Sequence, residues 1–437
     1  MKHWDEARSE SEKRLRDLLA REQGIERVAL IDDIFGKVRV VAWLAPGCPP
    51  EVRSRIPELM QESAGAFWSG DLWVASEASG VDSAVYQAAW DEAVELTPRL
   101  RRCDRHRTRG YWLGAPIDPP WPAPEHLELP PIVAFYSFKG GVGRTTALAS
   151  FAIQRASAGE RVVVVDLDLE APGAGVFLNP GEGVPGARWG VVDYLMERAL
   201  LEKVDVRDYY HTCTAHLGSP IVDVQFFVVP AGTLDQNYLE KLARIDLEPP
   251  PPDEVHPLIG LLRQIKDELD PSWILLDCRA GLSEAAGFVL SGLAHLYVLF
   301  GTPSEQSWQG LGVILERLGA ERIRSQQPQV ECLLVQAMVP ANLDTAASAK
   351  AEFETEALSR FSGLYYAPDP EDPEEDRFWY VRDSDSSDAP HVPIPIRYKE
   401  ELAFIRSLDQ VADILGSEPD FALLASRIAS RFVGEEQ

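Results

Sequence analysis

The stretch that decides the fold is "FYSFKGGVGRTTAL", residues 135 to 148. An apolar run typical of a strand precedes its glycines, and a helix-length run follows them. Gly140, Gly141 and Gly143 let the backbone turn sharply, so that its N–H groups can face anionic oxygens. The helix that begins near Arg144 adds its positive N-terminal end. This order predicts a phosphate-binding loop, and a plain glycine turn between strand and helix is the alternative.

Two later motifs place carboxylates where a phosphate loop needs them. "RVVVVDLDLEAPG" ends an apolar strand with Asp166 and Asp168, and "WILLDCRAG" ends another with Asp277. The carboxyl ends of parallel strands share one edge of the sheet, so these side chains should lie beside the loop. There they can hold a Mg²⁺ shell or orient an attacking water, although a strand-end aspartate is often only a helix cap. Thr145 stands where a hydroxyl would ligate Mg²⁺.

The three motifs together resemble the MinD/ParA group of the SIMIBI P-loop ATPases. The deviant Walker A loop of that group reads KGGxGK[ST], and its later motif reads DxxAG, as in "KGGVGRTT" and "LLDCRAG" here. The resemblance covers about residues 130 to 437. It implies ATP and Mg²⁺ as cofactors, ATPase activity and a nucleotide-dependent homodimer. It further suggests that the dimer regulates an unidentified protein partner in a bacterial multi-protein system, in defence or localisation.

The resemblance also implies a role for individual residues. Lys139 would reach the phosphates of the partner subunit's nucleotide, and Asp168 would orient the attacking water. The implied catalytic residues are Lys139, Asp168 and Arg144. The implied metal site consists of Thr145, Asp166 and Asp277. The implied nucleotide-binding residues are Gly140, Gly141, Val142, Gly143, Arg144, Thr145, Thr146 and Gln336, the last standing where relatives often place an adenine-contacting asparagine.

The chain departs from the family pattern at two positions. Arg144 replaces the usual loop lysine, and its planar, forked guanidinium keeps the charge but changes the geometry. We therefore expect ATP binding with slow or partner-stimulated hydrolysis. A non-hydrolysing interaction module, which binds nucleotide only for stability or sensing, is the alternative. Arg279 stands near the place of a usual proline, from which it would reach phosphate or the partner subunit.

The pattern of apolar runs and helix-length segments along the chain predicts two folded domains. Short, almost wholly apolar runs after residue 130 alternate with helix-length segments, which is typical of a doubly wound, mainly parallel α/β sheet. We expect a small N-terminal α+β domain of unknown role at 1–114 and a stiff proline-rich linker at 115–130. The ATPase domain would span 131–437, with an acidic surface insertion at about 367–392.

Composition narrows the classes of partner and compartment. The formal net charge of -27 repels nucleic acid and anionic membranes as a mean field. The five cysteines show no CxxC spacing, and the charged beginning of the chain has no apolar core of signal-peptide type. The longest apolar run is too short to span a bilayer. These features predict a reduced, cytoplasmic protein.

Two weaker signals concern surfaces. The arginines between Arg99 and Arg109, followed by Tyr111 and Trp112, could bind nucleic acid or an acidic surface. A solvated or internally paired face is the favoured reading of this cluster. An apolar stripe from Phe421 to Phe432 has near-helical spacing, and we expect it to dock on the core rather than on a membrane.

Overall fold

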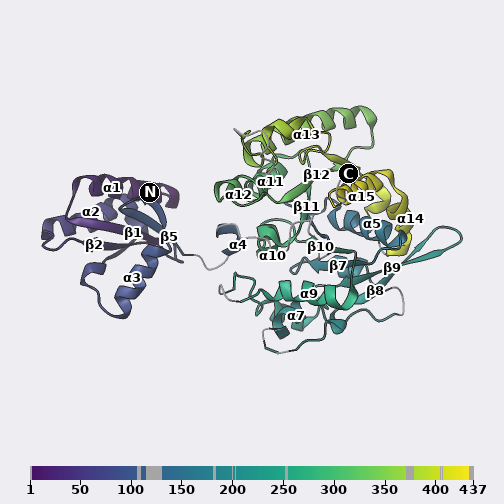
Figure 1. The fold of residues 1–437 in the computed structure, drawn as a ribbon, viewed down its shortest axis with the longest axis horizontal. Coiled ribbons are helices and arrows are strands. Elements are labelled where there is room, and N and C mark those ends of the chain that lie inside the picture. Colours follow the sequence, from purple (N-terminus) through teal and green to yellow (C-terminus); the bar gives the residue numbers. More distant parts are fainter. Residues whose placement is uncertain are drawn as a thin grey trace. The chain divides into compact units, whose positions relative to one another are not determined.

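The chain folds into two compact units, Met1–Thr108 and Arg109–Gln437. The computed structural model describes residues 2–105, 110–114, 130–180, 184–198, 200–201, 203–250, 254–370, 378–403, 405 and 407–432. Figure 1 follows the chain through both units, from purple at the N-terminus to yellow at the C-terminus.

The first unit is a five-stranded mixed sheet with helices on both faces, as predicted for a small α+β domain. Its strand order is β3-β2-β1-β5-β4, in which β1 runs antiparallel to β2 and parallel to β5. The β1–β2 hairpin turns at Gly36, whose φ of 77° favours glycine. The bounds are α1 (Trp4–Arg21), β1 (Ile25–Asp32), β2 (Val38–Leu44), α2 (Pro50–Ala64), β3 (Trp68–Val74), α3 (Val81–Asp91), β4 (Val94–Thr97) and β5 (Leu100–Asp104).

Alternation along β1 builds a core on each face of this sheet. Val28 and Leu30 pack with buried residues of α1 and α2. Ala29 and Ile31 point the other way and pack with Trp90 of α3. Successive side chains of a strand point to opposite faces, so one strand serves both cores.

The arginine cluster is paired within the first unit wherever the structure describes it. Arg99 donates to the backbone carbonyl of Glu22, just after α1, and to that of Glu26 in β1. Arg102 is buried and lies 3.1 Å from the carboxylate of Asp32, while Arg105 lies 2.7 Å from Glu92. Arg101 pairs likewise with Glu95. Arg107 and Arg109 lie outside the described residues, so the internally paired reading holds for the four described arginines.

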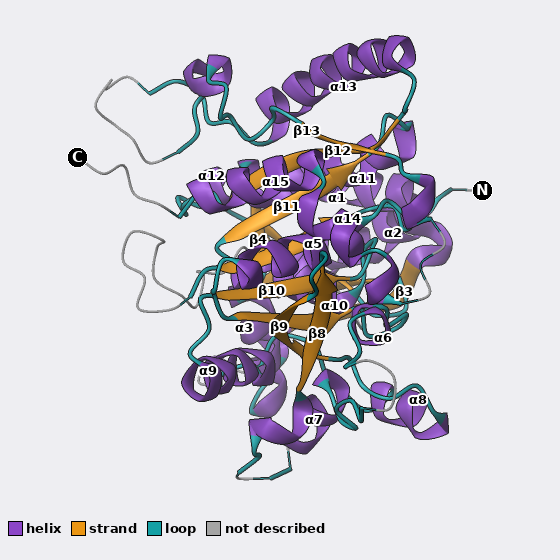
Figure 2. Ribbon diagram, turned by 90° about the vertical axis from the view of Figure 1, so that its right-hand side faces the viewer, coloured by secondary structure: helices purple, strands orange, loops and turns teal. Residues whose placement is uncertain are grey.

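The second unit contains an eight-stranded sheet in the order β13-β12-β11-β6-β10-β7-β9-β8. Every neighbouring pair is parallel except β8 and β9, which confirms the predicted doubly wound, mainly parallel fold. Figure 2 shows β11, β10, β9 and β8 one after another across this sheet. The strands are β6 (Ile132–Ser137), β7 (Val162–Leu167), β8 (His211–Leu217), β9 (Val222–Val229), β10 (Trp273–Cys278), β11 (Leu296–Gly301), β12 (Glu331–Val339) and β13 (Ile394–Arg397).

Two apolar cores cover the faces of the larger sheet. Val163 and Val165 of β7 face one core, and Val162 and Val164 face the other. All four are fully buried, as expected for strands covered on both sides. The helices of this unit are α4 (Gly110–Leu113), α5 (Arg144–Ser157), α6 (Ala174–Phe177), α7 (Val191–Arg198), α8 (Gln236–Leu242), α9 (Pro257–Leu269), α10 (Glu284–Phe288), α11 (Glu305–Leu318), α12 (Ala320–Arg324), α13 (Leu343–Leu364), α14 (Ala412–Ser417) and α15 (Pro419–Ser430).

The segment that leads into the second unit is anchored on it. The Tyr111 ring lies 4.7 Å from the Phe288 ring of α10, and its carbonyl accepts a 2.6 Å hydrogen bond from Arg317 of α11. Trp112 Nε1 donates to the carbonyl of Ser283 at 2.7 Å. Residues 110–114 therefore pack with the second unit, whereas we had predicted them in the N-terminal domain. Residues 115–129 of the predicted linker lie outside the described residues.

The last two predicted surface features are both anchored in the core. In the predicted acidic insertion, Ala367, Tyr380 and Ala389 are buried, and residues 371–377 lie outside the described part. On α15, Leu424 and Ile428 are buried in the core that also covers α5. The C-terminal apolar stripe is thus packed on the sheet. No helix among the described residues is long and apolar enough to cross a membrane.

Candidate functional site

The glycine-rich loop leaves β6 after Ser137 and enters α5 at Arg144. Gly141 has a φ of 73° and Gly143 a φ of 84°, a region that residues with a Cβ atom rarely adopt. A Cβ atom added at Gly140, Gly141 or Gly143 would meet no atom within 4 Å. The space against the loop is therefore open, and the free N–H groups at the start of α5 favour an anion there.

Arg144 is buried and tied to groups at the ends of two strands. Its Nε donates to Asp277 Oδ1 at 2.9 Å, and one terminal nitrogen donates to Ser137 Oγ at 3.2 Å. Burial by itself lowers the pKa of Arg144, but the Asp277 carboxylate raises it above its usual value. Arg144 is therefore a permanent cation at the base of the loop.

The second carboxylate oxygen of Asp277 accepts a hydrogen bond from the loop threonine. Thr145 Oγ1 donates to Asp277 Oδ2 at 2.7 Å, so the two carboxylate oxygens hold successive residues of the loop. Burial raises the pKa of Asp277, and the Arg144 cation opposes that rise. Arg144, Thr145 and Asp277, three residues predicted for the site, are thus brought together.

Strand pairing places Asp166 next to Asp277. The two residues are register partners on the parallel strands β7 and β10. Asp166 is fully buried and accepts two backbone hydrogen bonds, at 3.1 Å from Asp168 N and at 3.0 Å from Gly175 N. Burial, together with the Asp277 charge, raises the pKa of Asp166 to about 7.

Asp168 lies between two guanidinium groups. Its Oδ2 is 3.6 Å from Arg144, and its Oδ1 accepts a 3.0 Å hydrogen bond from Arg279. Arg279 also forms an ion pair with Glu170 at 2.6 Å. Asp168 therefore joins the loop arginine to the arginine that follows Asp277.

Three predicted residues are separate from this cluster. Lys139 is exposed and forms no hydrogen bond or ion pair among the described residues. Thr146 is half-buried on the first turn of α5, and Val142 is buried in the core that includes residues of α5. The contact of Lys139 with the nucleotide of a partner subunit stays a prediction.

Gln336, the predicted adenine contact, is buried on β12 beside β11. Its Nε2 donates to the carbonyl of Ala349 in α13 at 3.2 Å. No hydrogen bond joins Gln336 to the glycine loop in the part of the chain that the structure describes. Its contact with adenine stays a prediction.

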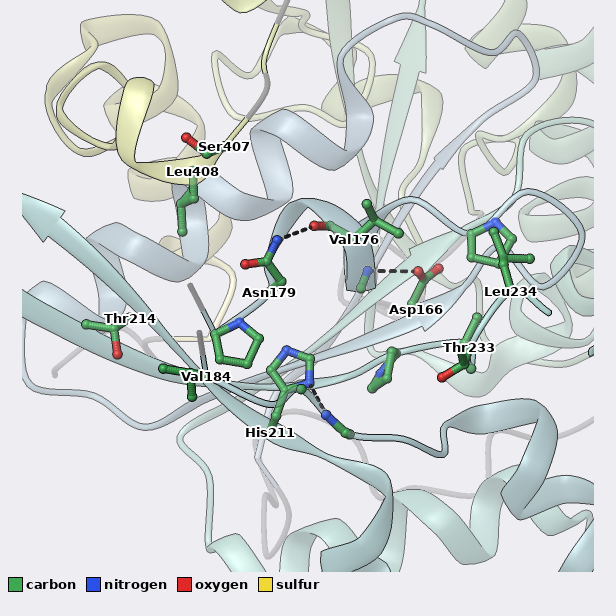
Figure 3. Close-up of a pocket in the computed structure, with 18 of the residues that line it drawn as sticks. Asp166, Val176, Asn179, Val184, His211, Thr214, Thr233, Leu234, Ser407 and Leu408 are labelled. Carbon is green, nitrogen blue, oxygen red and sulfur yellow. Dashed lines mark hydrogen bonds between the residues drawn. The ribbon is translucent and has the colours of Figure 1, made fainter. Parts of the chain in front are cut away.

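A cavity of about 650 Å³ is lined by Asp166 and by residues 230–234, which follow β9. Figure 3 shows Asp166 near Thr233 and Leu234 at one side, with Ser407 and Leu408 at the opposite side. His211 is built into its wall, because Nδ1 accepts from the Ala187 amide at 3.2 Å while Nε2 contacts the Leu178 carbonyl. The loop residues do not line this cavity.

The hard oxygen donors present suit Mg²⁺ held mainly by phosphate and water. Among the described residues, no group of three or more His, Cys, Asp or Glu side chains is placed to hold a metal ion. Mg²⁺ usually takes only one or two protein oxygens beside substrate phosphates. Thr145 Oγ1 and the Asp277 carboxylate, 2.7 Å apart, fit that requirement.

Several residues of the site carried no strong sequence signal. Ser137 ends β6 as an ordinary strand residue, yet it accepts from Arg144. Glu170 follows Asp168 by two residues, a spacing that could have suggested a shared partner. The cavity residues come from distant segments and share no motif.

Comparisons with known proteins find similarity to nucleotide-binding proteins. The family described as the CobQ/CobB/MinD/ParA nucleotide binding domain matches residues 133–324. An uncharacterised ATP-binding protein of Methanocaldococcus jannaschii is 26% identical over 220 residues, which cover 46% of this chain and 70% of that protein. The matched family region contains the glycine loop, Asp166, Asp168 and Asp277.

Solved structures of similar proteins include two MinD proteins of Pyrococcus species. The cell division ATPase MinD of Pyrococcus furiosus is 19% identical with a TM-score of 0.42, covering 69% of this chain and 100% of that one. The septum site-determining protein MinD of Pyrococcus horikoshii, solved with Mg-ADP, is 16% identical with a TM-score of 0.41, covering 69% and 96%.

Proposed function

We propose that the chain is a Mg²⁺- and ATP-binding molecular switch with slow hydrolysis, because residues 133–324 match the CobQ/CobB/MinD/ParA nucleotide binding domain. ATP would drive dimerisation or a change of conformation that regulates a partner protein in a bacterial multi-protein system, such as defence or localisation. The observation that carries the proposal is the convergence of Arg144 and Thr145 on Asp277 beneath an open glycine loop.

The residues of the cluster divide the work of phosphoryl transfer among them. The loop amides and the N-terminus of α5 would bind the phosphates, and Thr145 with Asp277 would hold Mg²⁺, supported by Asp166. Bound Mg²⁺ neutralises charge on phosphate oxygens. Asp168 would orient the attacking water. Lys139, exposed and unpaired among the described residues, would reach the nucleotide of a second subunit.

We propose that the hydrogen bonds of Arg144 make ATP hydrolysis slow. To contact phosphates, the Arg144 guanidinium has to leave Asp277 and Ser137, with which it now forms hydrogen bonds. Hydrogen bonds to charged groups are worth about 1.5–3 kcal/mol each, so this exchange adds to the barrier. The same tie favours the second candidate, a nucleotide-bound interaction module without turnover.

The first test measures mass and turnover in the same samples. Light scattering would be recorded with ATP-Mg²⁺, with ADP-Mg²⁺ and without nucleotide, together with phosphate release. We expect a dimer only with ATP-Mg²⁺, and slow release of phosphate. An ATP complex that forms without any phosphate release, even with a partner present, would favour the interaction module.

Two lysine-to-alanine variants, one of them a matched control, test whether Lys139 is needed for dimerisation. Lys139→Ala should bind ATP but fail to dimerise, because it removes the charge that would reach across the interface. Lys350→Ala removes an exposed lysine on α13 whose ion-pair partner among the described residues is Glu354, and this variant should dimerise like the wild-type protein. Dimerisation of Lys139→Ala with ATP would contradict the cross-subunit role.

A further inference from the structure

The two oxygens of the Asp168 carboxylate have different surroundings. Oδ1 accepts hydrogen bonds from Arg279 at 3.0 Å and from the Ala171 amide at 3.1 Å. Oδ2 faces Arg144 at 3.6 Å and accepts no hydrogen bond among the described residues. One oxygen is thus fixed by the scaffold, and the other is turned toward the glycine loop.

Arg279 is itself fixed on its far side. Its Nε lies 2.6 Å from Glu170, so the guanidinium bridges two carboxylates from the segment after β7. Arg279 directly follows β10 and stands two residues after Asp277, in the turn that ends at Gly281, whose φ is 76°. Its position is therefore set by the strand that also carries the proposed Mg²⁺ residue, and not by Arg144.

Arg279 compensates the negative charge of the Asp168 carboxylate. This negative charge contributes to the raised pKa of both Asp166 and Asp277, for which burial is the larger cause. In the nucleotide-free protein Arg144 and Arg279 both oppose that charge. Once the Arg144 guanidinium turns to phosphate, Arg279 is the remaining cation that contacts Asp168 among the described residues.

We infer that Arg279 is a positioning residue, which holds Asp168 by Oδ1 so that Oδ2 stays directed at the phosphate loop. This inference rests on the proposed function, since Oδ2 is the oxygen that would accept a proton of the attacking water. Without Arg279 the carboxylate can rotate about its Cβ–Cγ bond, and neither oxygen keeps its direction. The sequence suggested that Arg279 reaches phosphate or the partner subunit instead, and a role at the phosphates differs from a positioning role in what it does to ATP affinity.

Kinetics on the whole chain separate the two roles. A positioning role predicts that Arg279→Ala slows single-turnover phosphate release about 10- to 100-fold, while the Kd for ATP changes less than about threefold. Arg279→Lys should recover part of the rate, because an ammonium can pair with one carboxylate but cannot bridge both. Arg207→Ala is the matched control, since Arg207 forms an exposed, doubly bonded pair with Glu268, and it should change neither quantity.

A double variant tests whether the effect passes through Asp168. Asp168→Asn combined with Arg279→Ala should be no slower than Asp168→Asn alone, because residues that act as a unit are not additive. If the rate of the double variant fell by the product of the two single-variant losses, the inference would be overturned. Equal losses of ATP affinity and rate in Arg279→Ala would overturn it too, and would assign Arg279 to the phosphates.

Hydrogen exchange decides the matter without turnover. In the nucleotide-free protein, Arg279→Ala should speed exchange of the Ala171 amide, which donates to the same oxygen, and Arg207→Ala should not. Unchanged exchange would overturn the inference. If the wild-type protein bound no ATP, the proposed function would be refuted. The exchange rate of the Ala171 amide would still report whether Arg279 holds Asp168.

Discussion

At the scale of single residues, the exchange of lysine for arginine in the loop changes what the loop contacts. The Arg144 fork donates to Asp277 and Ser137 and faces Asp168 from a third nitrogen. A lysine at this position carries one nitrogen on a flexible stem and cannot contact all three at once. The family's usual lysine is therefore not equivalent to the arginine found here.

Substituting Arg144→Lys tests this difference. A lysine leaves the carboxylates more easily for phosphate, so we expect phosphate release to rise about tenfold, as for the loss of one charged hydrogen bond. Parallel measurements of ATP affinity and single-turnover phosphate release would check it. Unchanged affinity and rate would mean that the arginine has no special role.

The sequence predicted the identities in this cluster better than their contacts. Asp166, Asp168 and Asp277 could be selected because they stand at the ends of apolar runs, and Arg144 and Thr145 because they follow the glycines of the loop. The contacts depend on strand order, since only the adjacency of β7 and β10 makes Asp166 and Asp277 partners. No local pattern encodes that adjacency.

At the scale of elements, strands that are buried on both faces were easy to predict, and edge strands were not. Apolar runs marked β6, β7 and β10, which lie side by side in the sheet. β8, at one edge, alternates buried and exposed residues, and β13, at the other, has only four residues. Such strands lack the continuous apolar signal, because one face or most of their length meets solvent or loops.

Two glycine substitutions in the loop provide an element-scale prediction. Gly143→Ala should lower the free energy of unfolding by about 1 kcal/mol, because its φ of 84° at the N-cap of α5 disfavours a Cβ atom. Gly140→Ala is the matched control, since Gly140 is not among the glycines with positive φ and has open space around it. Urea denaturation of both variants would measure the difference. Equal stabilities would show that the backbone of Gly143 is not strained by a side chain.

At the scale of the whole molecule, composition predicted two folded units but not where they divide. The proline-rich segment suggested a boundary after residue 114, whereas the division falls between Thr108 and Arg109. "GYWL" at 110–113 was read as the end of an arginine-rich surface stretch. Its two aromatic residues instead pack on the second unit, beside α10 and α11.

That docking determines where the chain can be cut. Arg317 is buried, and two of its acceptors are the carbonyls of Tyr111 and Gly114, at 2.6 and 2.7 Å. A shortened chain of residues 115–437 would lose both acceptors and leave Glu321 as the remaining partner of this buried cation among the described residues. It would also remove the Tyr111 ring from the ring of Phe288. Burying a charge without its acceptors costs about 1–3 kcal/mol for each lost hydrogen bond.

A chain of residues 109–437 keeps those contacts and serves as the comparison. We expect the 115–437 chain to unfold at lower urea concentration and to aggregate, and the 109–437 chain to do neither. Equal behaviour of the two would mean that α4 contributes nothing to the second unit. Otherwise α4 acts for the second unit as an amino-terminal plug, and a biochemist who trims the protein at its proline-rich stretch would be studying an unplugged fold.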